Sequence, residues 1–404
     1  MTYVSEASAI RDNPAADVIE QLDTTAGSLV HRLFWSDRRH DDAATKPRPH
    51  LAIASASCIV ATYVPLLIAA WVTLPLLTER YGEVLLPFLR DWNVMFMFFV
   101  TMPALVAYLV NDQSVLTTAL GRTVREEVLD LSVADAIALC AEWKQRFQWV
   151  NVSAQVIGAF IGAAVAWTNY SVYSPASVGY WTMHEGHLTG AGGVFLWGVF
   201  LFFTLTAVYV VRSVAVTFFL RALLKCSNIR VIPFHPDGSG GLRPVGAIGL
   251  NNQYLLSIYG LNLISFVIVK QSLNVPGGLR VLMITAAVMY AVVGPVVFVA
   301  PLIQFRAGMM RAKTELMNEV AQRIRMELER IRIKLRKDDI TKSDEELIDR
   351  LRKIGAVIKD LPVWPFDVPT VRKFLTAYLA PFVTVGVPFL IKQGFDYLSK
   401  RLGL

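Results

Sequence analysis

The chain has 404 residues, of which 54% are hydrophobic and only 18% are charged, and its mean hydropathy is +0.46. A soluble protein would carry about a quarter charged residues, whereas several apolar runs here reach the roughly 20 residues that a helix needs to cross a bilayer. Composition therefore excludes an ordinary soluble domain and predicts an all-α fold, that of a polytopic α-helical membrane protein. The net charge of +7 comes from Lys and Arg gathered in particular inter-span segments. This pattern is typical of membrane orientation, so no nucleic-acid partner is expected.

The cysteines Cys58, Cys140 and Cys226 are far apart in sequence and show no CxxC spacing. Neither a disulfide framework nor a metal site is indicated, and no cofactor is expected. The first fifty residues are polar and mixed in charge, so no cleavable signal peptide is visible.

Residues 1–50 are predicted to form a cytoplasmic N-terminal arm. Its stretch 17-DVIEQLDTTAGSLVHRLFWSDRRH-40 is weakly amphipathic, which predicts either a helix on the membrane surface or a partly disordered tail. A six-helix transmembrane domain over residues 51–303 follows. Its spans are predicted at about 51–77, 93–110, 150–168, 194–213, 253–270 and 281–303.

Local sequence patterns refine the predictions for the third and fourth spans. Ser132 followed by Asp135 resembles an N-cap with an acidic first turn, so a helix starting near Val133 is predicted to run straight into the third span. That span contains 158-GAFIG-162, a small-xxx-small pattern that lets two helix backbones approach closely. In the fourth span, Arg212 is predicted to lie near the cytoplasmic end and to reach for the headgroups.

Basic residues divide the connecting segments into two sets. The basic set comprises the N-terminal arm and segments 111–149, 214–252 and 304–372. The other set carries few Lys or Arg and comprises segments 78–92, 169–193 and 271–280. Because basic loops stay on the cytoplasmic side, the amino terminus and the basic set are expected in the cytoplasm.

Two segments follow the spans. Residues 304–360 are predicted to form a cytoplasmic helical hairpin or coiled coil, because apolar residues recur three and four apart. The two helices would pack only on each other or would also mediate homo-oligomerisation. Residues 361–404 are predicted to form a C-terminal membrane-associated segment. Pro381 and Pro388 interrupt its apolar stretch 374–391, which is therefore either a seventh span or a re-entrant segment.

The polar residues inside the predicted spans are amides and hydroxyls, and no Asp, Glu or His lies in the middle of any predicted span. Proton relays and ion-coupled transporters place ionisable groups near the midplane, so this pattern weakens the case for coupled transport and for intramembrane hydrolysis. A passive pore remains compatible with it. Its pore-lining candidates are Asn262 and Ser265.

Histidines of an outer loop resemble a metal motif only superficially. In 184-HEGH-187 the two histidines are three residues apart, whereas the zinc-protease signature H-E-x-x-H needs them four apart on a helix. The stretch lies in a Gly-flanked loop and no third ligand is evident. No metal site is predicted.

The stretch 235-HPDGSGGL-242 has several interpretations. Pro236, Asp237 and Gly238 suit a tight turn, because proline presets φ, aspartate bonds its own backbone and glycine accepts positive φ. Catalysis or metal binding by His235 and Asp237 lacks a third group. The loop could also serve as a docking surface. We expect the two side chains to brace the loop.

An anion site is the remaining interpretation of this loop. Successive backbone N–H groups can converge on a phosphate or carboxylate, and a lipid headgroup supplies such an anion. The residues that would bind it are Gly238, Gly240, Gly241 and Arg243. The stretch lacks the spacing and the lysine of a P-loop.

The loop HPDGSGGL between the fourth and fifth spans, together with 363-VWPFDVPTVRKFL-375 near the carboxyl end, resembles a group of uncharacterised bacterial multi-pass membrane proteins. These have an HPDxxGGL-type cytoplasmic loop and a late WPFD-type segment. The resemblance rests on about twenty-five residues plus the order of hydropathy. It implies residence in the bacterial inner membrane and conveys no activity.

From these features we expect a non-enzymatic, oligomeric inner-membrane assembly with channel-like conduction of ions or small solutes. One alternative is a membrane sensor or scaffold that signals through the helical hairpin. Another is an enzyme that acts on lipid headgroups at the cytoplasmic face through His235, Asp237 and Arg243. The expected partners are the lipid bilayer and further copies of the chain.

Overall fold

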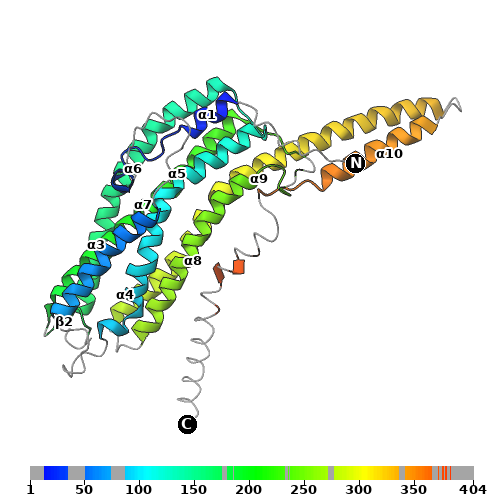
Figure 1. Cartoon of the computed structure of the whole chain (residues 1–404). Helices are drawn as coiled ribbons and strands as arrows, with labels where there is room; N and C mark the ends of the chain where they lie inside the picture. Colours follow the sequence, from blue (N-terminus) through cyan, green and yellow to red (C-terminus); the bar gives the residue numbers. More distant parts are fainter. Residues whose placement is uncertain are drawn as a thin grey trace, which may run out of the picture.

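The computed structural model describes residues 13–34, 51–73, 87–174, 180–184, 186–232, 235, 237–271, 277–335 and 342–365, with 372, 375, 376, 378, 379 and 383. Nearly all of these residues are helical (Figure 1). The elements in chain order are α1 (Pro14–Glu20), α2 (Leu29–Phe34), α3 (Leu51–Val72), η2 (Phe88–Arg90), α4 (Trp92–Phe96), η3 (Met97–Thr101), α5 (Met102–Arg125), β1 (Leu129–Asp130), α6 (Val133–Tyr173), β2 (Met183–His184), β3 (His187–Leu188), α7 (Gly190–Cys226), β4 (Asn228–Ile229), α8 (Arg243–Gln271), α9 (Gly277–Leu335) and α10 (Lys342–Lys359).

Two short strand pairs mark the two ends of the helix bundle. At one end β1 pairs with β4 antiparallel, with Leu129 opposite Ile229, and at the other end β2 pairs with β3, with His184 opposite His187. Helices α5 and α7 run from the β2–β3 end to the β1–β4 end, and α8 runs back (Figure 1). Side chains on these three helices can therefore be ordered from one end of the bundle to the other.

Five helical segments are long and apolar enough to cross a membrane, and they overlap the first five predicted spans. These segments are Leu51–Val72, Trp92–Arg125, Val133–Tyr173, Gly190–Cys226 and Arg243–Val269. The sixth predicted span, 281–303, lies inside α9, a continuous helix of 59 residues. Within α9 the described apolar stretch is Thr285–Val296, which is shorter than a bilayer crossing.

Helix α6 confirms the expected run from the connector into the third span. Its N-cap is Ser132, whose hydroxyl oxygen accepts a hydrogen bond from the Asp135 backbone N–H at 3.1 Å. The cap satisfies one of the free N–H groups of the first turn. From there the helix continues unbroken for 41 residues to Tyr173.

The small-xxx-small pattern is used inside the chain, between α6 and α7. A Cβ atom on Gly158 would lie 2.7 Å from the Thr204 carbonyl oxygen, and one on Gly162 would meet the Phe200 carbonyl oxygen. The Thr204 hydroxyl donates to the Gly158 carbonyl oxygen at 3.2 Å. Only glycine permits this approach, so the two longest spanning helices pack backbone to backbone.

A proline explains the irregular start of α5. Pro103 has no N–H, and its ring would clash with the carbonyl group four residues earlier in a regular α-helix. The turn just before it, η3, is a π-helical turn that widens the backbone there. The helix from α4 through η3 to α5 therefore stays continuous over Trp92–Arg125.

The described part of the N-terminal arm packs into the bundle. Ile19 and Ala16 of α1 are fully buried, and Arg125 of α5 forms ion pairs with Asp17 at 2.9 Å and Glu20 at 2.6 Å. For α1 the expectation of a surface helix or a disordered tail is therefore wrong, because the amphipathic pattern faces protein rather than lipid. In α2, by contrast, Leu33 is exposed.

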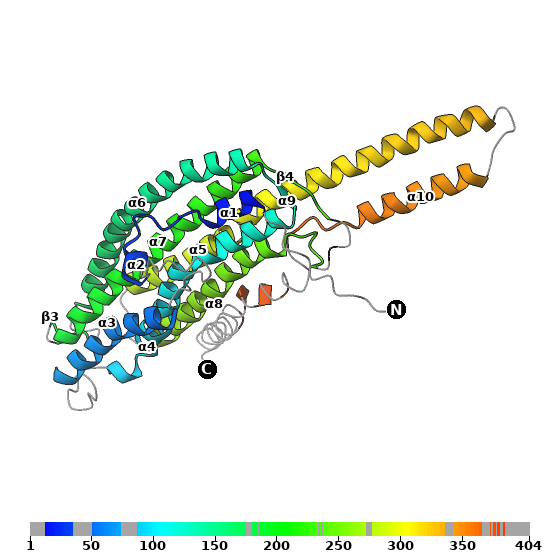
Figure 2. The same cartoon turned by 45° about the horizontal axis from the view of Figure 1, so that its top comes forward.

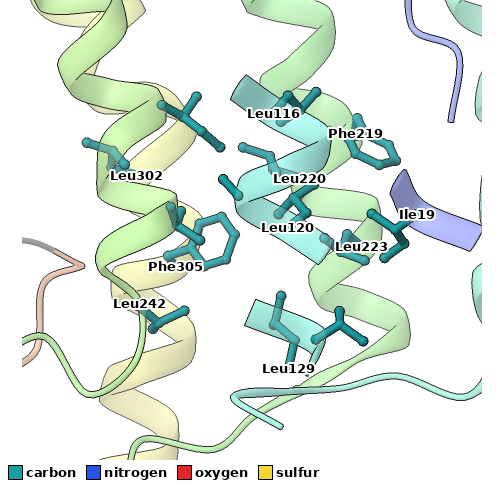
Figure 3. Packing of buried hydrophobic residues seen from close by; sticks show 14 of the residues in the cluster. Ile19, Leu116, Leu120, Leu129, Phe219, Leu220, Leu223, Leu242, Leu302 and Phe305 are labelled. Atoms are coloured by element: carbon teal, nitrogen blue, oxygen red, sulfur yellow. The ribbon is translucent and has the colours of Figure 1, made fainter. Parts of the chain in front are cut away.

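The main core lies at the β1–β4 end, where α1, α5, α7 and α9 meet (Figure 3). Apolar side chains from these four helices and from the adjoining strand and loop point toward one another there. The labelled members are Ile19, Leu116, Leu120, Leu129, Phe219, Leu220, Leu223, Leu242, Leu302 and Phe305. This core anchors the arm to the spanning helices.

Helix α9 leaves the bundle and α10 runs back along it as an antiparallel pair (Figure 2). Lys334 forms an ion pair with Asp344 at 2.8 Å near the tip, and the Lys313 ammonium donates to the Leu361 carbonyl oxygen at 2.9 Å near the base. Farther on, Tyr378 stacks on Tyr290 of α9 with ring centroids 5.1 Å apart. Most of the predicted segment 374–391 lies outside the described residues.

Candidate functional site

The loop 235–242 is organised around one carboxylate. Asp237 Oδ1 accepts hydrogen bonds from the backbone N–H groups of Ser239 at 2.8 Å and Gly241 at 3.0 Å, and Oδ2 accepts one from the Arg243 N–H at 3.1 Å. His235 Nδ1 lies 2.8 Å from Asp237 Oδ1. The carboxylate thus closes the loop and caps the first residue of α8. Pro236 lies outside the described residues.

These contacts set the charge state of the loop. Burial would raise the pKa of Asp237, but hydrogen bonds from the backbone of Gly241, Ser239 and Arg243 and from His235 lower it below its ordinary value. A carboxylate that accepts several backbone N–H groups is held in its ionised form. Asp237 therefore acts as a fixed negative charge rather than as a proton donor.

The glycines of the loop meet a backbone requirement. Gly238, Gly240 and Gly241 have φ values of 67°, 66° and 90°, a region that side-chain-bearing residues rarely adopt. The N–H groups of Gly241 and Arg243, which an anion site would use, already donate to Asp237. The geometry accordingly favours the bracing interpretation of His235 and Asp237.

The HEGH stretch forms a tight hairpin. His184 and His187 are opposite each other in the β2–β3 pair, and both side chains are exposed. Gly186 in the turn has a φ of 79°. Among the residues that the structure describes, no group of three His, Cys, Asp or Glu side chains is arranged to bind a metal ion.

The two pore-lining candidates lie on α8 within the bundle. The Ser265 hydroxyl donates to Asn93 Oδ1 at 3.3 Å and to the Asn262 carbonyl oxygen at 2.7 Å. Asn262 Oδ1 is buried and has no hydrogen-bond partner among the described residues. Asn262 and Ser265, predicted from the sequence as pore-lining residues, therefore both lie on α8 and face other helices or their own helix.

A buried ion pair that sequence reasoning missed joins α5 to α7. Arg212 Nη2 lies 2.8 Å from Asp112 Oδ1 and Arg212 Nε lies 3.0 Å from Asp112 Oδ2, so the contact is bidentate. The Arg212 and Asp112 side chains are only 4% and 10% exposed. The expectation that Arg212 snorkels to the headgroups is wrong, because its guanidinium points into the bundle and is neutralised there.

The N-terminal arm completes this cluster. Arg212 Nη1 donates to the Thr24 carbonyl oxygen and to Asn151 Oδ1, both at 3.3 Å. Asn151 of α6 in turn donates to the carbonyl oxygens of Thr24 at 3.0 Å and Ala26 at 2.9 Å. Gln155, one turn along α6, donates to the Gly27 carbonyl oxygen at 2.8 Å. Arm, α5, α6 and α7 are thereby held by one polar network.

A signal for this pair was present in the sequence. The apolar run around Arg212 continues to residue 224, so the arginine lies well inside a helix. Asp112 comes just two residues after the predicted end of the second span, whereas α5 continues to Arg125. Extending both helices would have placed two opposite charges inside the bundle, and a charge there needs a partner.

Further polar side chains continue from the ion pair toward the β2–β3 end. Tyr108 donates to Asn252 Oδ1 and lies edge-on to the Tyr209 ring, with centroids 5.1 Å apart. Thr206 and Tyr259 share a hydrogen bond of 2.6 Å between their hydroxyl groups. We call the following set, which includes the ion pair, the polar track. Its members are Asp112, Arg212, Tyr108, Tyr209, Asn252, Thr206, Tyr259, Asn262, Ser265 and Asn93.

Two buried atoms of the polar track lack a protein partner. The Tyr209 hydroxyl and Asn262 Oδ1 have no hydrogen bond within the described part of the chain. Buried polar groups are nearly always hydrogen-bonded, to protein or to water. Protein groups of the described residues therefore leave these two atoms unsatisfied.

At the β2–β3 end a second buried carboxylate has a structural role. Asp91 Oδ1 accepts from the Val94 N–H at 3.3 Å as the N-cap of α4. Its Oδ2 accepts from the Tyr180 hydroxyl and from the Trp181 indole N–H, the latter at 3.1 Å. Asp91 thus ties the start of α4 to residues 180–181 beyond the end of the polar track.

The fold defines a class of protein. Five long apolar helices, joined by short strand pairs and loops, make this chain a multi-pass α-helical membrane protein. Comparisons with protein-family models, with curated proteins and with solved structures find no match to the chain. Its function is therefore inferred from the geometry of its own side chains.

Proposed function

We propose that the protein conducts small hydrated species, protons or small ions, along the polar track. The observation that supports this most directly is the pair of buried atoms without protein partners, the Tyr209 hydroxyl and Asn262 Oδ1. Water bound at these two atoms would link the hydroxyl and amide groups of α5, α7 and α8 into a hydrated path. A non-enzymatic conductor needs only such groups and no catalytic set.

The ion pair and the arm act as the closed gate of this path. The Asp112–Arg212 pair and the arm carbonyl groups lie at the end of the polar track nearest the β1–β4 end. A buried bidentate pair is costly to separate, so conduction requires the arm and Arg212 to move together. Displacement of the arm would expose the carboxylate of Asp112 to the path.

The finer topology belongs to the same proposal. We place six spans in the bacterial inner membrane, the sixth within α9, with the amino terminus and the α9–α10 pair in the cytoplasm. The alternation of basic segments along the sequence supports this orientation. Self-association of the chain through the α9–α10 pair would make the protein a homo-oligomer.

Flux into liposomes tests the proposal. The purified full-length chain is reconstituted with a pH-sensitive dye inside, and proton influx under an imposed potential is compared with protein-free liposomes. Tyr209→Phe and Asn262→Leu remove the two water-binding atoms, and each is expected to reduce flux by about tenfold, the effect of one lost hydrogen bond of about 1.4 kcal/mol in the path.

Ser257→Ala is the matched control for these variants. Ser257 also lies on α8, but its hydroxyl bonds to the Gln253 carbonyl oxygen of the same helix at 3.0 Å. Its flux should equal that of the unsubstituted protein. Wild-type flux no greater than that of protein-free liposomes, for protons and for small cations, would overturn conduction.

A specific observation favours the scaffold alternative. The α9–α10 pair exposes large apolar side chains at Met326, Leu328 and Ile333 of α9 and at Ile354 of α10, each about half exposed or more. Met326 and Ile333 are seven residues apart and therefore lie on one face of α9, and an exposed apolar face is typical of a surface that binds another helix. Loss of oligomers in Met326→Glu/Ile333→Glu with unchanged flux per chain would favour a scaffold role for the pair.

A further inference from the structure

Exposed tryptophans define where the bilayer meets the bundle. Trp149 and Trp167 of α6 are each 70% exposed and lie eighteen residues apart, which is about 27 Å along a helix. This matches the roughly 30 Å hydrocarbon core of a bilayer, at whose two boundaries tryptophan is enriched. The large side chains that α6 exposes between them are apolar, and Ser153, Ala163 and Ala164 are exposed as well. The large apolar side chains are Val152, Val156, Ile157, Phe160 and Ile161.

Helix α7 gives the same boundary on its own residues. Trp197 is exposed near its β2–β3 end, and the exposed apolar side chains Val214 and Phe218 follow 17 and 21 residues later. Arg221 and Lys225, both exposed, come one and two turns farther on. The basic pair therefore lies beyond the hydrocarbon boundary that Trp149 marks, on its headgroup side.

A groove between α6 and α7 opens at this depth. Its volume is about 700 Å³, with an apolar floor of Trp143, Val150, Ala215 and Ala222. Trp149 and Phe218 flank it on the hydrocarbon side, where an acyl chain would enter. Helices α6 and α7 run side by side in both views (Figures 1 and 2).

The polar rim of the groove carries three cations. Arg146 is paired with Glu142 one turn earlier and lies over the Trp143 ring, with its Cζ atom 5.1 Å from the ring centroid. Arg221 and Lys225 take part in no ion pair with the residues that the structure describes. Even with Glu142 counted, the rim keeps an excess of positive charge that faces the headgroup layer.

We propose that this groove is a binding site for an anionic phospholipid. Its acyl chain lies against Trp149, Val150 and Phe218, and its phosphate accepts hydrogen bonds from Arg221 and Lys225. The basis is charge complementarity at headgroup depth, because each cation near an anionic surface strengthens binding by about fivefold. The inference is independent of the conduction proposal, since no member of the polar track lines the groove.

Quenching of tryptophan fluorescence by brominated lipids tests the site. The full-length protein is reconstituted in phosphatidylcholine vesicles that contain equal fractions of either brominated phosphatidylglycerol or brominated phosphatidylcholine. The signal of the groove is the part of the quenching that Trp149→Phe removes. This part is expected to show a preference for phosphatidylglycerol of about twenty-fivefold, from two cations at about fivefold each.

Charge reversal separates a site from a diffuse basic surface. Arg221→Glu/Lys225→Glu should abolish the preference at Trp149, whereas Lys144→Glu, an exposed basic residue of α6 that does not line the groove, should leave it unchanged. Folding of each variant is checked by its elution volume and helical content. Equal quenching by both lipids in the unsubstituted protein, or an equal loss in Lys144→Glu, overturns the proposal.

Discussion

Two of the carboxylate contacts in the protein, His235–Asp237 and Asp112–Arg212, differ in how far along the chain they reach. His235 and Asp237 are two residues apart and brace their own loop, with Asp237 bonded to the N–H groups of Ser239, Gly241 and Arg243. Asp112 and Arg212 are one hundred residues apart and join two spanning helices to the arm.

The difference teaches where sequence motifs are informative. The loop motif is conspicuous because glycine, proline, histidine and aspartate interrupt apolar helices. Its hydrogen bonds, however, stay mostly within the loop itself. The long-range pair carries no motif, but it holds four segments of the bundle and ends the polar track. The local pattern therefore indicates a turn. The network of Asp112, Arg212 and the arm carbonyl groups forms only through contacts between distant segments.

The largest effect is expected from breaking the long-range pair. Arg212→Met leaves the Asp112 carboxylate buried without its cation, and removing one partner of a buried pair costs about 3–5 kcal/mol. The measurement is the temperature at which half of the protein loses its monodisperse elution in detergent. Arg212→Met/Asp112→Leu should recover most of the loss, because replacing both partners is often neutral. A double variant as unstable as the single one contradicts this account.

A pH dependence tests the surroundings of the same pair. The pKa of His31 is lowered from 6.5 to about 4, mainly by burial and further by nearby Arg212, while Asp23 opposes the change. Between these pH values the unfolded chain binds more protons than the folded one, so stability rises with pH in this window. On acidification from pH 7.5 to 4, about 3 kcal/mol should be lost.

His31→Gln removes the titrating group and should flatten that window. Melting temperatures at pH 4.5 and 7.5 are compared for the variant and the unsubstituted protein. An unchanged difference between the two pH values in His31→Gln would assign the acid sensitivity to other groups.

The smallest effects are expected in the loop. Asp237→Ala leaves three backbone N–H groups without their acceptor and should cost about 1–3 kcal/mol, measured by the same thermal assay. His235→Ala should cost less than about 1 kcal/mol, because the three backbone bonds to Asp237 persist. If His235→Ala instead abolishes function at normal expression and oligomer size, the catalytic interpretation of the loop is right.

Local chemistry decided what could be predicted. Ser132 could be identified as the N-cap of α6 because the capping pattern lies within four residues. The glycines of the loop could be assigned to a turn, and they have positive φ. The membrane class follows from the length and apolar content of five segments. The prediction that one helix runs from Val133 into the third span was also confirmed, because it rested on the same local cap and on the apolar sequence that follows it.

Contacts between distant segments could not be predicted in this way. The GAFIG pattern predicts close helix packing but does not specify the partner helix, which in the structure is α7. The arm looked like a surface segment because amphipathicity does not say whether lipid or protein covers the apolar face, and Ile19 is buried in protein. Asp112 looked like a connector residue because hydropathy marks the end of an apolar run rather than the end of a helix.

By itself, then, the sequence determined the membrane class, the positions of five apolar helical segments and the turn chemistry, since these depend on neighbours within a few residues. Tertiary structure alone decided that Arg212 meets Asp112, that the arm carbonyl groups close this cluster, and that Tyr209 and Asn262 lie on one polar track. The physical reason is that a charge or an amide can be buried only where a neighbouring helix offers it a partner. The hydropathy along one helix does not specify which helix that neighbour is.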